Sequence, residues 1–231
     1  MRHTLSLAAA LAALAAPAAA QDLGGVYLRA HGGMFFPSAT DTGVQGEIED
    51  GQLPEFDITG QREGEADGGV VFGGLIGAMV SERLAVEAEV TFRSYDFEPR
   101  EELTSTIGGP ALAEGDVQTT SYMVNAVYHL QKAGRFTPYI GAGAGYAVPG
   151  GQFDVYEGDF AYQVKAGVST PIWFGHLGVE ASYFGAADFE TEFDVTATDP
   201  VSGFEETRTF SAYAEQSGAA IMVTYTVPLG E

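Results

Sequence analysis

Acidic and basic residues alternate with apolar ones along one stretch of the sequence, LAVEAEVTFR (84–93). Glu87, Glu89 and Arg93 take one parity, and the other parity is wholly apolar. Residues two apart on a β-strand point to the same face, so these charged groups could pair with one another or line an ion path. On a helix the apolar set would scatter around the circumference. The stretch therefore predicts a strand with one apolar and one charged face.

Three more charged residues fall on the non-apolar parity of other alternating segments. Together they predict a polar cluster inside a closed sheet: Arg29, Glu87, Glu89, Arg93, Lys165 and Glu180. Such a cluster could be a narrow ion path or gate, or a salt-bridged plug. An eight-stranded barrel is barely wide enough for its own side chains, which favours the plug. A buried charge left unpaired is strongly destabilising. We therefore expect Glu87 and Glu89 to pair with Arg29, Arg93 and Lys165 in a structural role.

Catalytic chemistry has few candidate residues. Glu87 and Glu89 lie on one strand face and would not flank a substrate bond as glycosidase carboxylates do. A lipid A-modifying barrel enzyme would need a histidine with a serine partner, and only His31, with Ser182 or Ser217, could supply one. We predict no enzymatic activity, no catalytic residue and no cofactor, and keep the lipid A enzyme as an alternative.

A run of alternating acids offers oxygen ligands for a cation. Asp188, Glu190, Glu192 and Asp194 alternate, but no EF-hand or glycine–aspartate repeat is present. The acids could form a weak divalent-ion bridge to lipopolysaccharide phosphates or serve simply as solubilising loops. The prediction is for the solubilising loops, with no resident metal.

The elements that position these residues are eight alternating segments. We predict strands over 26–36, 70–80, 84–95, 120–130, 136–148, 160–170, 177–184 and 221–227. The short connections are 81–83, 131–135 and 171–176, and the long ones are 37–69, 96–119, 149–159 and 185–212. A strict short–long rhythm is typical of an outer-membrane barrel, which has turns at one rim and loops at the other. The predicted fold class is all-β, an eight-stranded antiparallel up-and-down transmembrane β-barrel.

Charged and aromatic residues are distributed as such a barrel requires. Most of the 32 acidic residues fall in the long connections, and no charge interrupts the apolar parity at membrane depth. A charge there would cost roughly 2–4 kcal/mol at mid-bilayer. Aromatic residues gather near strand ends, which predicts two interfacial girdles. The turn-rim girdle is Tyr128, Phe136, Tyr139, Trp173, Phe174 and Tyr225; the loop-rim girdle is Phe36, Phe92, Tyr95, Tyr122, Tyr146, Tyr162 and Tyr183.

The first twenty residues read as a secretory signal peptide. A positive start, an apolar run and Ala18–Ala20 before Gln21 match its three regions. We expect residues 21–231 to form a single barrel domain. The chain has no cysteine, and its formal net charge of −22 argues against nucleic acid as a partner.

Three segments, LAVEAEVTFR, SYMVNAVYHL and TPYIGAGAGYAV, resemble strands three to five of small eight-stranded Gram-negative outer-membrane proteins, the OmpA-like or opacity-protein-like barrels. The resemblance implies a non-enzymatic outer-membrane barrel with a structural, surface-interaction or minor transport role. It implies lipid, lipopolysaccharide and the barrel-insertion machinery as partners, and leaves the ligand of the loops unidentified. The sequence departs from the family in two respects: no peptidoglycan-binding module follows strand eight, and TYTVPLGE replaces the usual terminal aromatic. A soluble, exported lipocalin-like ligand-binding barrel, with its apolar parity inward, is the other alternative.

Overall fold

The structure is a computed structural model that describes residues 25–38, 40–45, 60–66, 68–99, 115–151, 158–198 and 205–229. The predicted signal peptide, residues 1–20, lies outside the described residues. In the described part of the chain, no helix is long and apolar enough to cross a membrane.

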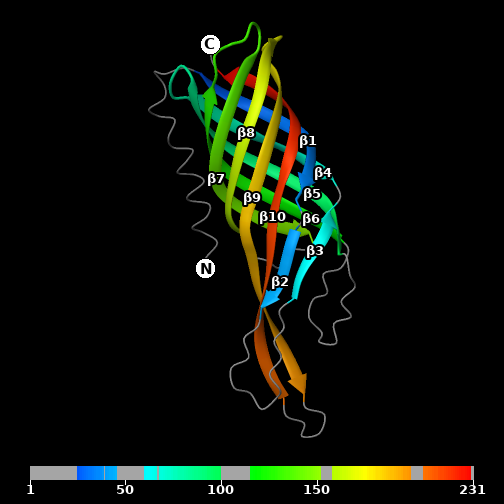
Figure 1. The fold of residues 1–231 in the computed structure, drawn as a ribbon. Helices are drawn as coiled ribbons and strands as arrows, with labels where there is room; N and C mark the ends of the chain where they lie inside the picture. Colours follow the sequence, from blue (N-terminus) through cyan, green and yellow to red (C-terminus); the bar gives the residue numbers. More distant parts are fainter. Residues whose placement is uncertain are drawn as a thin grey trace.

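The described elements are β-strands that wind into a closed barrel with a sheet extension at one end (Figure 1). The barrel strands are β1 (Val26–Pro37), β4 (Gly69–Met79), β5 (Leu84–Pro99), β6 (Gly115–His129), β7 (Thr137–Gly151), β8 (Asp159–Ile172), β9 (Gly175–Thr198) and β10 (Glu205–Leu229). Two shorter strands, β2 (Thr40–Gln45) and β3 (Gly60–Ala66), lie between β10 and β5 in the extension.

Antiparallel pairing between the first and last strands closes the barrel. β1 pairs with β4 on one side and with β10 on the other, so Val26 is opposite both Ala78 and Leu229. The remaining neighbours are consecutive along the chain, from β4–β5 through to β9–β10. Closure leaves the barrel without an unpaired edge, which a bilayer demands. The predicted eight-stranded antiparallel up-and-down barrel is confirmed.

The apolar parity of the strands faces outward. On β5, Val90 is 47% exposed, whereas Glu87 on the opposite face is fully buried. The same division runs along β1, where Leu28 is exposed and Arg29 buried. The lipocalin-like alternative is therefore wrong, because it needed the apolar parity inside the barrel.

Several strands extend beyond the predicted ends. The connection predicted over 185–212 is largely paired β-structure, since β9 and β10 continue together as far as Thr198 and Glu205. A register shift between Ala214 and Gln216 marks where this hairpin leaves the barrel. The segment predicted as a loop over 37–69 likewise contains β2 and β3. Apolar and polar residues continue to alternate in FETEFDVTAT (189–198), beyond the part of β9 that faces the bilayer. Although this segment is rich in acids, it therefore still pairs as a strand.

The predicted aromatic girdles need one correction. Phe136 and Trp173 at the turn rim and Phe36 at the loop rim are exposed, as predicted. Tyr139 and Tyr95 are 2% and 3% exposed, respectively, and point into the barrel. Both stand on the inward parity of their strands, so their hydroxyls meet polar side chains rather than lipid headgroups.

Candidate functional site in the barrel interior

The six predicted cluster residues all lie inside the barrel. Their relative exposures range from 0% at Glu87 to 6% at Arg29. They come from four strands: Arg29 from β1; Glu87, Glu89 and Arg93 from β5; Lys165 from β8; and Glu180 from β9. Alternation turns each of them inward, and closure of the barrel brings together residues far apart in the sequence.

Ion pairs link five of the six residues. Lys165 Nζ lies 2.7 Å from Glu87 Oε2 and 2.8 Å from Glu89 Oε2. Arg29 Nη1 lies 3.2 Å from Glu87 Oε1 and 3.5 Å from Glu180 Oε2. Each carboxylate thus has a cation beside it, and Glu87 bridges the two cations. The prediction that Glu87 and Glu89 pair with Arg29 and Lys165 agrees with this geometry.

Two tyrosines hold the carboxylates on the side nearer the turns. The Tyr27 hydroxyl donates to Glu87 Oε1 at 2.7 Å, and the Tyr139 hydroxyl donates to Glu180 Oε2 at 2.8 Å. The guanidinium carbon of Arg29 lies 5.7 Å from the ring centroid of Tyr27 and 5.1 Å from that of Tyr139. Arg29 is therefore fixed by carboxylates and by two aromatic rings at once.

Glycine makes room for each tyrosine ring. A β-carbon added to Gly77 on β4 would collide with the Tyr27 ring, and one added to Gly167 on β8 would collide with the Tyr139 ring. Because the inward side of each neighbouring strand is bare at that point, the rings can lie against the barrel wall and leave the centre to the charged groups.

Neutral side chains complete the coordination of Glu89. Thr91 Oγ1 and Asn125 Nδ2 each donate to this carboxylate at 2.8 Å, and Gln163 Nε2 donates at 3.2 Å. Gln163 also donates to Asn125 Oδ1 at 2.7 Å. Buried carboxylates need such partners for their remaining lone pairs, and here those pairs are satisfied from three strands.

Arg93 is the exception to the predicted pairing. Within the described chain no carboxylate lies within 4.0 Å of its guanidinium. Instead its carbon lies 3.9 Å from the ring centroid of Phe184, and Nη1 donates to Ser121 Oγ at 2.7 Å. Arg93 lies two residues beyond Thr91, at the next inward-facing position toward the loop rim. The expectation that it pairs with Glu87 or Glu89 is wrong.

Apolar side chains pack above and below the polar layer. On the turn side, Tyr27, Leu75, Ala85, Val127 and Tyr139 form one buried cluster. On the loop side, there are two clusters: Phe35, Val71, Tyr95, Val117, Ala220 and Met222; and Met123, Ala147, Ala161, Phe184, Ala186 and Phe189. The charges are therefore enclosed within the barrel.

Sequence reasoning missed most of the neutral partners. Tyr27, Asn125 and Gln163 sit on the inward parity at the depth of the charged residues, and that parity was the available signal. Tyr139 was assigned to the headgroup region because of its residue type, although Ile140 beside it already marked the outward parity.

His31 is held inside the same layer. Its Nε2 lies 3.0 Å from Thr91 Oγ1, which in turn donates to Glu89. This threonine, rather than Ser182 or Ser217, is its hydrogen-bond partner in the described structure. The acids Glu190, Glu192 and Asp194 lie in the paired part of β9, and their side chains, like that of Asp188, are outside the described ones. Among the described residues, no group of three or more His, Asp or Glu side chains could hold a metal ion.

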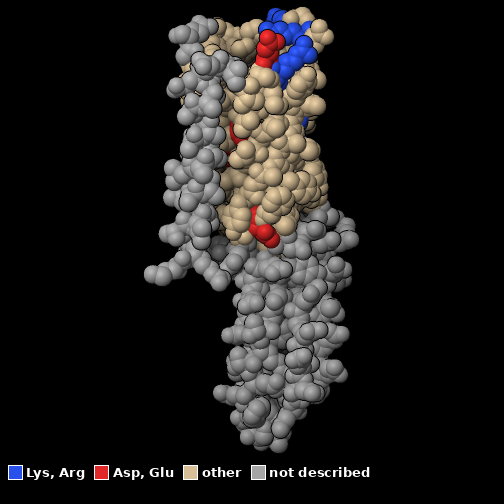
Figure 2. All heavy atoms as spheres, turned by 90° about the vertical axis from the view of Figure 1, so that its left-hand side faces the viewer, with Lys and Arg blue, Asp and Glu red and all other residues tan. Residues whose placement is uncertain are grey.

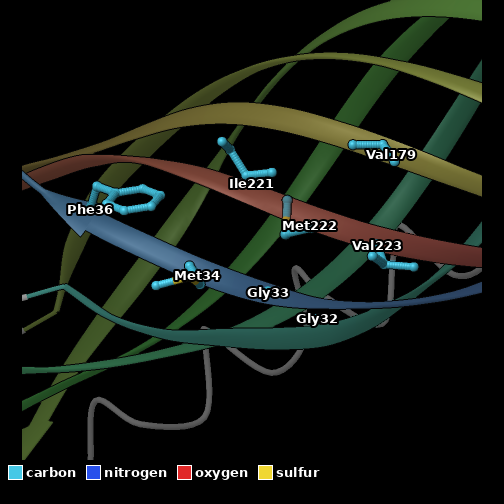
Figure 3. A pocket seen from close by; sticks show the side chains of 8 residues that line it. All are labelled: Gly32, Gly33, Met34, Phe36, Val179, Ile221, Met222 and Val223. Atoms are coloured by element: carbon cyan, nitrogen blue, oxygen red, sulfur yellow. The ribbon is translucent and has the colours of Figure 1, made fainter.

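The outer wall of the barrel has a shallow pocket between β1, β10 and β9. Figure 3 shows its lining residues on β1, β10 and β9: Gly32, Gly33, Met34, Phe36, Val179, Ile221, Met222 and Val223. Its volume is about 260 Å³. Glycines between larger residues create this notch, and its position on the apolar face places it against lipid.

Comparisons with known proteins agree with this architecture. Residues 6–225 match the family model described as "Outer membrane protein beta-barrel domain". Solved structures that resemble the chain include OprG from Pseudomonas aeruginosa, at 12% identity and a TM-score of 0.52, covering 88% of this chain and 96% of that one. They also include Neisserial surface protein A, at 12% identity and a TM-score of 0.41, covering 85% of this chain and 97% of that one. A third is AlkL, at 19% identity and a TM-score of 0.42, covering 90% of this chain and 93% of that one.

No curated protein matches the sequence significantly. At such low identities, the likeness to OprG supports the fold alone, whereas the family model covers nearly the whole chain. With its closed barrel, apolar outer face and enclosed polar interior, this chain belongs to the outer-membrane β-barrel family and resides in the outer membrane.

Proposed function

We propose that this protein is a non-enzymatic outer-membrane barrel whose interior is a salt-bridged plug. Its role is structural or surface-interacting, with at most minor transport. The observation that carries the proposal is the ionic network across the lumen, in which Lys165 contacts both Glu87 and Glu89 at hydrogen-bond distance.

Charge balance supports the plug. The described interior holds three carboxylates and three permanent cations: Glu87, Glu89 and Glu180 against Arg29, Arg93 and Lys165. An ion path needs groups that can release their neighbours and coordinate a passing ion. Here direct contacts occupy the carboxylates, so an entering ion would have to break several ion pairs at once.

The apolar layers support the same proposal. Phe35 and Phe184 on the loop side and Val127 on the turn side are at most 1% exposed. Water and ions entering from either rim would have to displace these side chains before reaching a charged group. Dry constrictions of this kind oppose ion passage.

Conductance in planar bilayers tests the plug. Wild-type protein should insert with almost no current, because the network fills the lumen. Insertion is verified independently by the heat-dependent gel mobility of the folded barrel. Replacing outward-facing Val164 by alanine provides a matched control on β8 that should leave the trace unchanged. Large, stable single-channel steps from the wild type would contradict the proposal.

Surface interaction is assigned to the loop rim and the outer wall. The exposed aspartates Asp96 and Asp116 stand at the loop-side ends of β5 and β6. We infer acidic loops facing outward, lipid and lipopolysaccharide around the wall, and recognition by the barrel-insertion machinery during assembly. The His31–Thr91 contact supports a packing role for His31.

An assay of lipid A addresses catalysis directly. Cells producing wild-type protein or the His31→Ala variant should have the same lipid A profile, since the proposed role of His31 is structural. Mass spectra of extracted lipid A provide the comparison, with empty-vector cells as the control. A modification present only with the wild type would instead reveal an enzyme.

A further inference from the structure

Among the basic side chains that the structure describes, the exposed ones lie at one end of the barrel. Of the six lysines and arginines whose side chains the structure describes, three are buried in the lumen, and the others lie exposed on the turns: Arg83, Lys132 and Arg135. Figure 2 shows blue atoms gathered at this rim, with one red group beside them. At the opposite rim, the exposed charges described are acidic, among them Asp96 and Asp116. A chain of formal charge −22 therefore has a positive patch at its turn rim.

Backbone contacts bring the basic turns together. His129 N, at the end of β6, donates to Arg83 O at 2.7 Å, which joins the turn after β4 to the one after β6. Ala133 N donates to Phe136 O at 2.9 Å and closes the small turn that contains Arg135 and directly follows Lys132. The three cations thus occupy adjacent turns of one rim.

These cations form no ion pair with the described side chains of the protein. No described carboxylate lies within 4.0 Å of Arg83, Lys132 or Arg135, although Glu82 adjoins the first of them in sequence. Arg135 is held in place, since its Nε donates to Thr170 Oγ1 at 3.2 Å and its guanidinium carbon lies 5.6 Å from the Phe136 ring centroid. Its outer guanidinium nitrogens are left for a ligand. Neighbouring positive charges repel, and an anion between them would relieve that repulsion.

Exposed aromatic residues place the patch at the depth of lipid headgroups. Trp173 is 89% exposed and Phe174 is 73% exposed on the turn after β8, and Phe136 is 47% exposed on the turn beside it. Trp173 has a positive φ of 49°, a conformation that β-turns rarely demand of a bulky residue. Tryptophan, whose ring is apolar but carries a polar N–H group, favours the membrane–water interface, and the apolar wall of the barrel begins just beyond this turn.

We propose that the turn rim binds the headgroups of anionic phospholipids. The lipid phosphate would lie among Arg83, Lys132 and Arg135, and the acyl chains would run along the apolar wall below Phe136. Charge complementarity at headgroup depth selects this ligand, because polar–aromatic contacts alone would not distinguish an anionic lipid from a zwitterionic one. This binding surface goes beyond the proposed function, as it is independent of the plug and of the loops.

The chain contains one tryptophan, Trp173, which reports on this rim. The full-length folded protein is reconstituted in phosphatidylcholine vesicles containing either bromine-labelled phosphatidylglycerol or equally labelled phosphatidylcholine. Quenching of Trp173 fluorescence then measures which lipid is enriched beside the rim. We expect the anionic lipid to be enriched roughly threefold at low salt and the enrichment to vanish in concentrated salt.

Two triple variants separate charge from shape. R83Q/K132Q/R135Q should quench equally with both lipids, whereas R83K/K132R/R135K should retain the wild-type preference because its charges are kept. Heat-dependent gel mobility verifies that both variants fold, and the single variant K132Q should show an intermediate preference. Equal quenching by the two lipids in the wild type, or an undiminished preference in the glutamine variant, would overturn the proposal. Loss of binding to isolated peptidoglycan in the glutamine variant, with the lipid preference unchanged, would assign the patch to the cell-wall polymer and overturn it too.

Discussion

The interior of this barrel holds its cations in two different ways. Lys165 and Arg29 lie among carboxylates, with nitrogen–oxygen distances of 2.7–3.5 Å. Arg93, closer to the loop rim, lies on the Phe184 ring and takes a hydroxyl partner, Ser121. Removing a cation from the first region leaves buried anions unpaired, whereas removing Arg93 leaves mainly an aromatic face and a hydroxyl. These cations are buried to a similar degree, but we expect replacement of Lys165 or Arg29 to destabilise the barrel far more than replacement of Arg93.

The largest effect is expected for Lys165→Met. This change leaves Glu87 and Glu89 without their shared cation and should lower the free energy of unfolding by about 3–5 kcal/mol. Urea unfolding of the protein in lipid vesicles measures it. Lys132→Met makes the same chemical change at an exposed position and should shift the free energy by no more than about 0.5 kcal/mol. Equal losses in both variants would contradict the pairing.

A smaller effect is expected for Tyr139→Phe. The variant keeps the ring against Gly167 but loses the hydroxyl that donates to Glu180, a hydrogen bond to a charged group that contributes about 1.5–3 kcal/mol. Outward-facing Tyr128→Phe on the neighbouring strand is the control and should be nearly neutral. The same unfolding measurement distinguishes them, and a neutral Tyr139→Phe would argue against this contact.

The smallest interior effect is expected for Arg93→Met. The variant loses the ring and hydroxyl contacts, but methionine carries no charge, so folding no longer has to desolvate the guanidinium. The free energy of unfolding should therefore fall by only about 1 kcal/mol. Arg93→Lys, which retains the charge but cannot stack as a plane, should be at least as destabilising. An Arg93→Met loss equal to that of Lys165→Met would remove the distinction between the two regions.

How far the sequence predicts this molecule depends on which physical rule decides each feature. Alternation alone assigns the outward and inward faces, so Glu87 and Lys165 were placed in the lumen correctly. It does not specify partners. Strand tilt and stagger bring Lys165 beside Glu87 and leave Arg93 without a carboxylate at ion-pair distance among the described residues, and both are properties of the closed barrel. Sequence reasoning misses the ends of β9 and β10 because it treats the acid-rich segment 185–212 as a long connection, although antiparallel hairpins can continue into water with polar faces. The prediction places Tyr139 in the headgroup region because of its residue type, whereas its inward parity on β7 correctly indicates the barrel interior.

The seam between β1 and β10 has a consequence for how the chain reaches this state. Val26 pairs with Leu229, so the ring closes only when segments from nearly opposite ends of the described sequence meet. Contacts so distant in sequence form slowly, since a long loop must be ordered before they yield any stabilisation. Until that moment β1 and β10 each present an unpaired edge that can pair with another chain. The polypeptide is consequently most vulnerable to aggregation during the interval before β1 pairs with β10.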